Sequence, residues 1–140
     1  MKHLLIAASF IFSLTTFAQT AAPVLPASLG KTMKAMSTNL KAIVAQATEA
    51  TKNESSAKLA DDFVTLTLHA KDFAVDSIQA LPAEQQAAAK AEYDKMLEQT
   101  AITGQQLAAA FRANDNVLAA NLLKQLSQDK KDGHDKFKKD

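Results

Sequence analysis

The 140-residue chain contains no cysteine and no tryptophan, and it has only three glycines and three prolines. Without cysteine there can be no disulfides, thiolate metal ligands or thiol nucleophiles. The scarcity of glycine and proline leaves long uninterrupted stretches, which are rich in Ala, Leu, Lys, Gln and Asp. Because good helix formers dominate and no window shows β-branched alternation, the composition predicts an all-α protein.

The chain also lacks an excess of charge of either sign. Sixteen Lys and Arg residues stand against fifteen Asp and Glu residues, for a formal net charge of +1. A nucleic-acid partner would require concentrated positive charge, so we expect none. The sequence has no nucleophile elbow, no glycine-rich phosphate loop and no pair of histidines on adjacent helical turns. We therefore do not expect an enzyme.

Long apolar runs are confined to the N-terminus. Lys2 and His3 precede an apolar stretch from Leu4 to Phe17, and small residues at Thr16 and Ala18 suit a cleavage site. The stretch is too short to span a bilayer, so we predict a secretory signal peptide over residues 1–18, removed after Ala18. The competing interpretation is an uncleaved N-terminal anchor. Export to the periplasm follows from the prediction, and no later apolar run predicts membrane insertion.

The remaining chain is of a size typical for one domain. Pro23 and Pro26 mark residues 19–27 as a tail, which leaves residues 28–140 as the folded domain. Loss of Lys2 would leave 15 basic residues against 15 acidic ones.

Polar or proline breaks divide the domain into four helical segments, which we predict over residues 28–51, 54–80, 82–113 and 115–139. Ser28 and Asp115 are typical N-cap residues, and Pro82 suits a first helical position. Apolar residues recur at steps of three and four in each segment, as in Leu29, Met33, Met36, Leu40, Ile43 and Ala47. Such stripes face a common core. Because the connections look short, we predict an up-down-up-down antiparallel four-helix bundle.

Antiparallel folding brings particular residues to one level of such a bundle. Met33 lies near the start of the first helix, and counting back along each hairpin places it level with Phe73, Tyr93 and the region of His134. Leu97 lies one turn from Tyr93. We therefore expect Met33, Phe73, Tyr93, Leu97 and His134 to converge on one layer.

A thioether and an imidazole that face each other across an apolar pocket can occupy both axial positions of a haem iron. A Met/His pair leaves no open position for a substrate, which suits electron transfer. Phe73, Tyr93 and Leu97 would cover the macrocycle, and Lys130, one turn before His134, could reach a propionate. The alternatives are plain ones: Met33 as core filling and His134 as a solvated residue in a lysine-rich helix end.

The segments around both candidate ligands resemble a known family. MKAMSTNLKAI, residues 33–43, is similar to the first helix of the cytochrome b562 family, and QLSQDKKDGHDKF, residues 125–137, is similar to its last helix. Met33 and His134 match the axial methionine and histidine, and Tyr93 and Leu97 keep the spacing of two pocket aromatics. The central helices match only loosely. The resemblance implies a soluble periplasmic electron carrier with one non-covalent haem b per chain. The lack of cysteine excludes covalent attachment of a haem. The resemblance names no redox partner.

Two residues depart from the family pattern. Lys130 stands where an arginine is expected, so the charge is kept without the planar donor fork. Gly133 precedes the candidate histidine where an aromatic residue is usual. A second function, from a different class, also fits the pattern: a haem-free periplasmic interaction or stress protein with the same bundle. Under either function we expect a monomer, and the sequence assigns no role to His69.

Overall fold

The computed structural model describes residues 24–138. The expected signal peptide over residues 1–18 lies outside the described residues, as does most of the expected tail. Within the described range the chain is helical and contains no strand. The prediction of an all-α protein is therefore confirmed for this part of the chain. No helix among the described residues combines the length and the apolar character needed to cross a membrane.

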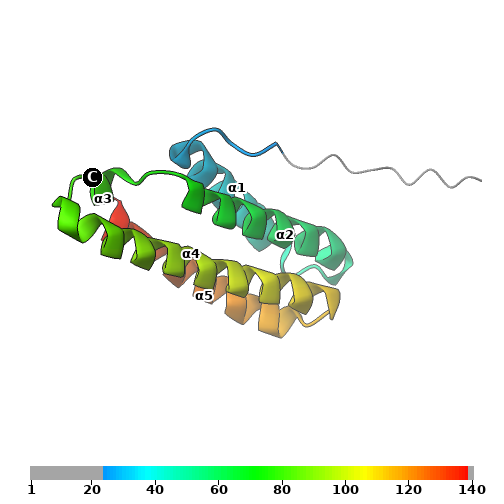
Figure 1. Ribbon diagram of the computed structural model, residues 1–140. Helices are drawn as coiled ribbons and strands as arrows, with labels where there is room; N and C mark the ends of the chain where they lie inside the picture. Colours follow the sequence, from blue (N-terminus) through cyan, green and yellow to red (C-terminus); the bar gives the residue numbers. More distant parts are fainter. Residues whose placement is uncertain (1–23, 139–140) are drawn as a thin grey trace, which may run out of the picture.

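Four long helices make up most of the fold (Figure 1). They are α1 (Leu29–Gln46), α2 (Asn53–His69), α4 (Ala83–Arg112) and α5 (Asn116–Phe137). Three short helical elements lie between them: η1 (Ala50–Lys52), η2 (Ala70–Asp72) and α3 (Asp76–Gln79). Helix α2 packs against both α1 and α4, and α4 packs against α5.

The predicted caps explain where two of the helices begin. The side chain of Ser28 accepts a hydrogen bond from the backbone N–H of Lys31, and that of Asp115 accepts one from Leu118 at 2.9 Å. Each satisfies a backbone donor that the first helical turn leaves unpaired. Pro82 immediately precedes α4, with extended backbone (φ −52°, ψ 143°), so it stands one position before the predicted one.

The predicted second helix is wrong in its second half. A helix was expected over residues 54–80, but α2 ends at His69 and the chain then runs through η2 and α3 before α4 begins. Phe73 and Val75 have extended backbone. Val75 and Ile78 are nevertheless buried, each 5% exposed. The apolar residues of this buried connection were therefore mistaken for part of a helix. The connection is also longer than the tight break expected at Pro82.

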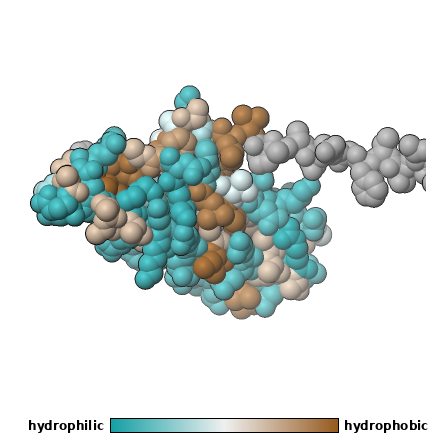
Figure 2. Space-filling view, in the orientation of Figure 1, coloured by the Kyte–Doolittle hydropathy of each residue, from teal (hydrophilic) through white to brown (hydrophobic). Residues whose placement is uncertain are grey.

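The core follows the predicted stripes in the long helices. The most deeply buried large side chains are Ile43, Leu107, Phe111 and Leu126. Met36 and Leu40 of α1 and Tyr93 and Leu97 of α4 belong to the same core cluster. On the surface in Figure 2, hydrophobic side chains lie in separate areas among hydrophilic ones. Packing of the four stripes against one another is what holds α1, α2, α4 and α5 together.

Three asparagines join the connections at one end of the molecule. Nδ2 of Asn53, at the start of α2, donates to Oδ1 of Asn114 at 2.9 Å and to Oδ1 of Asn116 at 3.0 Å. Nδ2 of Asn116 in turn donates to the carbonyl oxygen of Ala47, just after α1. Asn114 has a positive φ of 55°, a conformation that asparagine tolerates better than most residues. The cluster ties the α4–α5 turn to the α1–α2 connection.

Candidate functional site

A cavity of about 480 Å³ lies among α1, α4, α5 and the segment that contains α3. Its volume falls within the range of roughly 300–1,000 Å³ that small-molecule and cofactor sites occupy. Most of its lining is apolar. The side chains that form its walls include Met33, Met36, Val75, Tyr93, Met96, Leu97, Leu126, Lys130, His134 and Phe137.

Five of the six side chains predicted for the site line this cavity: Met33, Tyr93, Leu97, Lys130 and His134. Tyr93 and Leu97 of α4 are buried, 5% and 8% exposed. Met33 of α1 is half-buried, whereas Lys130 and His134 of α5 are exposed. Three different helices therefore contribute to the walls, and the thioether of Met33 and the imidazole of His134 come from different ones.

Phe73 is the sixth, and it does not line the cavity. Its ring packs edge-on against the imidazole of His69, with ring centroids 4.9 Å apart. The difference follows from the backbone, because Phe73 lies in the extended segment after η2 rather than on a continued helix. A helical stripe places residues by its period, and that period no longer applies once the helix has ended.

The aromatic ring that does accompany Tyr93 is that of Phe137, at a centroid distance of 5.1 Å in an edge-on arrangement. Phe137 packs against the core but was not among the side chains predicted for the site. The signal was available, since Phe137 lies three residues after His134 on one helix. Met36 also lines the cavity and was not predicted. Its position three residues after Met33 on the same helix was the corresponding signal.

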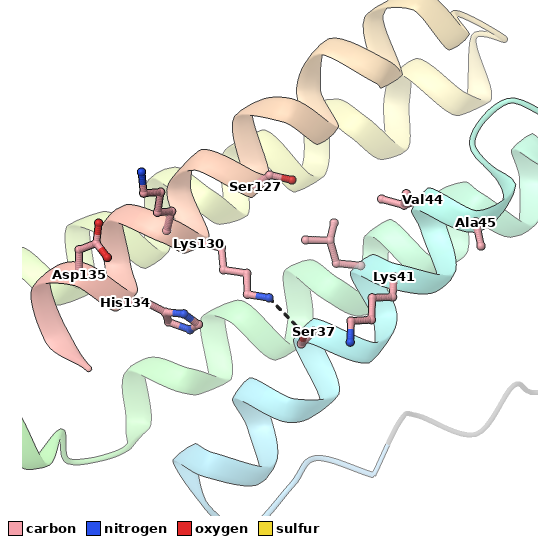
Figure 3. A pocket seen from close by; sticks show the side chains of 10 residues that line it. Ser37, Lys41, Val44, Ala45, Ser127, Lys130, His134 and Asp135 are labelled. Atoms are coloured by element: carbon pink, nitrogen blue, oxygen red, sulfur yellow. Dashed lines mark hydrogen bonds between the residues drawn. The ribbon is translucent and has the colours of Figure 1, made fainter. Parts of the chain in front are cut away.

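A second, more open cavity of about 610 Å³ lies between α1 and α5, and Figure 3 shows its walls. Nζ of Lys130 donates to Oγ of Ser37 at 3.3 Å and so links the two helices across it. Both Lys130 and His134 line this cleft as well as the inner cavity. The imidazole of His134 points from α5 toward the space beside α1 (Figure 3). It therefore stands where the cleft meets the inner cavity.

Two buried polar atoms of residues that line the inner cavity have no hydrogen-bond partner within the described residues. They are the hydroxyl of Tyr93 and Oδ2 of Asp129. Burial, reinforced by the charge of Asp94, raises the pKa of Tyr93 to about 12. Burial also raises the pKa of Asp129, against the opposing hydrogen bond from Gln125. A buried polar atom without a partner costs free energy, which a ligand with matching polar groups would offset.

His69, the other histidine of the described residues, lies outside both cavities. Its Nε2 is 2.9 Å from the carbonyl oxygen of Pro26, and its Nδ1 is 3.1 Å from Oδ2 of Asp72. Through its contact with Pro26, His69 holds the segment before α1 against the end of α2. Across residues 24–138, no group of three or more His, Asp or Glu side chains is arranged to hold a metal ion.

Comparison of the chain with protein-family models, with curated proteins and with solved structures found no match. The resemblance to the cytochrome b562 family therefore stays a prediction.

Proposed function

We propose that this protein is an electron carrier that binds one haem b without covalent bonds, with Met33 and His134 as the axial ligands of the iron. The observation that carries the proposal is that these two side chains, 101 residues apart in the sequence, line one apolar cavity from two different helices. Thioether and imidazole are an established axial pair for haem iron in electron-transfer proteins.

The relative directions of the four long helices are part of the same proposal. An up-down-up-down antiparallel bundle is supported by contacts at both ends of the molecule. At one end, Asn53 at the start of α2 bonds with Asn114, just after α4. Toward the other, Lys136 near the end of α5 pairs with Glu92 in the first third of α4, and His69 at the end of α2 meets Pro26, just before α1. Each contact joins the start of one helix to the end of its neighbour.

The residues present fit a non-covalent haem. The cavity is of cofactor size, its walls are mostly apolar, and Met33 and His134 supply a thioether and an imidazole as candidate ligands. The hydroxyl of Tyr93, which has no partner among residues 24–138, offers a hydrogen-bond donor inside it. Haem, when bound, supplies a single-electron couple between ferric and ferrous iron.

The protein's own residues would bind and shield that group. Met33 and His134 would hold the iron from two sides and leave it no vacant position. Leu97 and the rings of Tyr93 and Phe137 would exclude water from the macrocycle. Lys130 lines both the cavity and the cleft, so its ammonium group could bind a propionate there. In the structure its Nζ donates to Oγ of Ser37.

The proposal places the protein in the periplasm, after removal of residues 1–18, as a monomer that exchanges electrons with redox proteins. No nucleic-acid or membrane partner is part of it. A basic excess at the end of α5, with Lys130, Lys131, Lys136 and Lys138, would orient an acidic partner near the haem edge.

Titration of the haem-free protein with haem tests the proposal. The expected result is saturation at one haem per chain, with a visible spectrum that changes when Met33 is replaced by Leu or His134 by Ala. His69→Ala is the matched histidine control, and Met36→Leu is the matched methionine control. Both controls are expected to keep the wild-type spectrum.

The opposite result is also informative. A protein that remains colourless after titration would contradict haem binding and favour the haem-free interaction protein. A spectrum that is unchanged in both Met33→Leu and His134→Ala would show that haem binds elsewhere or through other ligands.

A further inference from the structure

The methionines of the described residues have an unusual distribution. The chain contains four, and apart from Met1 they are Met33, Met36 and Met96. All three line the inner cavity, together with His134. None of the buried apolar side chains of α2 and α4 is a methionine; they are Leu, Ala, Val, Phe and Tyr. Three thioethers and an imidazole are thus gathered around one space.

Two contacts bring these donors toward the same turn of α5. Ser37, the residue after Met36, bonds with Lys130, which lies one turn before His134. From the other side, a Cβ on Gly133 would lie 3.9 Å from Cε of Met96. Met33 and Met36 are three residues apart on α1, so they share a face of that helix. Helices α1 and α4, which carry the three methionines, therefore both contact the part of α5 around His134.

The chemistry of this donor set is selective. Thioether sulfur is a soft ligand that favours Cu(I), and imidazole also suits copper. Calcium and magnesium prefer oxygen ligands, so thioether sulfur suits them poorly. Oδ2 of Asp129, buried and without a hydrogen-bond partner in the described residues, also belongs to a residue of the cavity lining. A carboxylate there offsets the charge of a monovalent cation.

We propose that the haem-free protein binds one Cu(I) ion in this cavity, through the sulfurs of Met33, Met36 and Met96 and the imidazole of His134. The flexible methionine side chains allow the sulfur atoms to converge on the ion. The proposal does not rest on haem binding, because it uses two ligands, Met36 and Met96, that have no role at the haem iron. Since Met33 and His134 serve both, Cu(I) and haem exclude each other.

Competition with a colorimetric Cu(I) chelator under anaerobic conditions tests this proposal on the full mature chain. We expect one Cu(I) per chain. Met36→Leu and Met96→Leu should each weaken Cu(I) binding by at least the roughly tenfold that loss of an outer-shell partner costs a metal site. Leucine is close to methionine in volume, so the fold should persist, and far-UV circular dichroism checks that it does. His69→Ala is the histidine control and should bind Cu(I) as the wild type does.

X-ray absorption at the copper edge then identifies the ligands, with sulfur expected as the dominant neighbour. Failure of the chain to compete with the chelator would overturn the proposal, as would an affinity that Met36→Leu and Met96→Leu both leave unchanged. Neither outcome bears on haem. Met96→Leu separates the two proposals, because it should retain the haem spectrum of the wild type while losing Cu(I) affinity.

Discussion

Tyr93 is buried in the core, 5% exposed. Its ring packs edge-on against Phe137, and its hydroxyl is buried without a partner in the described residues. Burial disfavours the phenolate, and the negative charge of Asp94 adds to that effect. Tyr93 is also the only tyrosine, and the chain has no tryptophan, so its titration can be followed by ultraviolet absorbance without interference.

We predict that the phenol of Tyr93 titrates at a pH of about 12 in the folded protein and near 10 in urea, the value of an exposed tyrosine. Because the pKa of the folded state is the higher one, its contribution to stability is present below about pH 10 and is lost as the pH rises toward 12. The free energy of unfolding should fall across that interval. A folded-state midpoint near 10 would show that the hydroxyl is solvated, which would contradict its burial in the cavity wall.

At this scale the sequence predicted which side chains line the cavity where those residues lie on a long helix. Met33, Tyr93, Leu97, Lys130 and His134 all lie on α1, α4 or α5, where the helical period holds from cap to cap. Phe73 was misplaced because it follows the end of α2. The buried oxygen of Asp129 could not have been predicted, since its burial depends on side chains from other elements.

Helices α2 and α4 approach each other closely at Gly104. A Cβ at this position would lie 2.8 Å from Cγ2 of Val64 and 3.3 Å from Cδ1 of Phe63. Only glycine lets the two helices pack at this distance without displacing a side chain. Gly133 on α5 differs, because the nearest atom to its Cβ would be 3.9 Å away, an ordinary contact.

We predict opposite effects for the same substitution at the two glycines. Gly104→Ala should lower the free energy of unfolding, because overpacking of about 1–3 kcal/mol outweighs the roughly 1 kcal/mol that alanine gains in a helix. Gly133→Ala should raise it by up to about 1 kcal/mol, since only the helix propensity changes. Urea denaturation of both variants measures the difference. Equal effects of the two substitutions would contradict the close approach at Gly104.

The asparagine cluster offers a second test at the level of elements. Asn53 is 3% exposed and bonds with both Asn114 and Asn116. We predict that Asn53→Ala lowers the free energy of unfolding by about 1–3 kcal/mol, because the remaining amide groups lose partners in a partly buried site. Asn121→Ala, at an exposed position of α5, is the control and should have little effect or a slightly stabilising one. A near-neutral Asn53→Ala would mean that water replaces the lost bonds.

The helix ends show what local sequence can and cannot predict. Ser28 and Asp115 cap α1 and α5 because a short polar side chain satisfies a free backbone donor, and that signal is local. The course of residues 70–82 was not predictable in this way. Val75 and Ile78 are buried by contacts with distant parts of the chain. The hydroxyl of Ser77 donates a hydrogen bond to the carbonyl oxygen of Phe137 at 2.6 Å.

For the whole molecule, the notable asymmetry is between its helix pairs. Helices α1 and α2, α2 and α4, and α4 and α5 pack along their lengths, whereas α1 and α5 make fewer close contacts and flank the open cleft. Polar bridges cross that seam at Lys130–Ser37 and, near its end, at Asn116–Ala47. A ligand in the inner cavity would touch both α1 and α5, so binding should stabilise this seam.

The all-α class and the four packed helices could be predicted because patterns of period 3.6 extend over most of residues 28–137. The size of the cavity and its continuity with the cleft could not, because both depend on how far α1 stands from α5. The separation of α1 and α5 cannot be predicted from the sequence of either helix.

The most direct test of the account is the visible spectrum of the haem-loaded protein, recorded in the oxidised and the reduced state. With Met33 and His134 both bound, the account predicts the spectrum of six-coordinate, low-spin b-type haem, with a Soret band that shifts on reduction and resolved α and β bands. His134→Ala should lose these features, and His69→Ala should keep them. A five-coordinate, high-spin spectrum of the wild-type protein in both states would contradict the central claim.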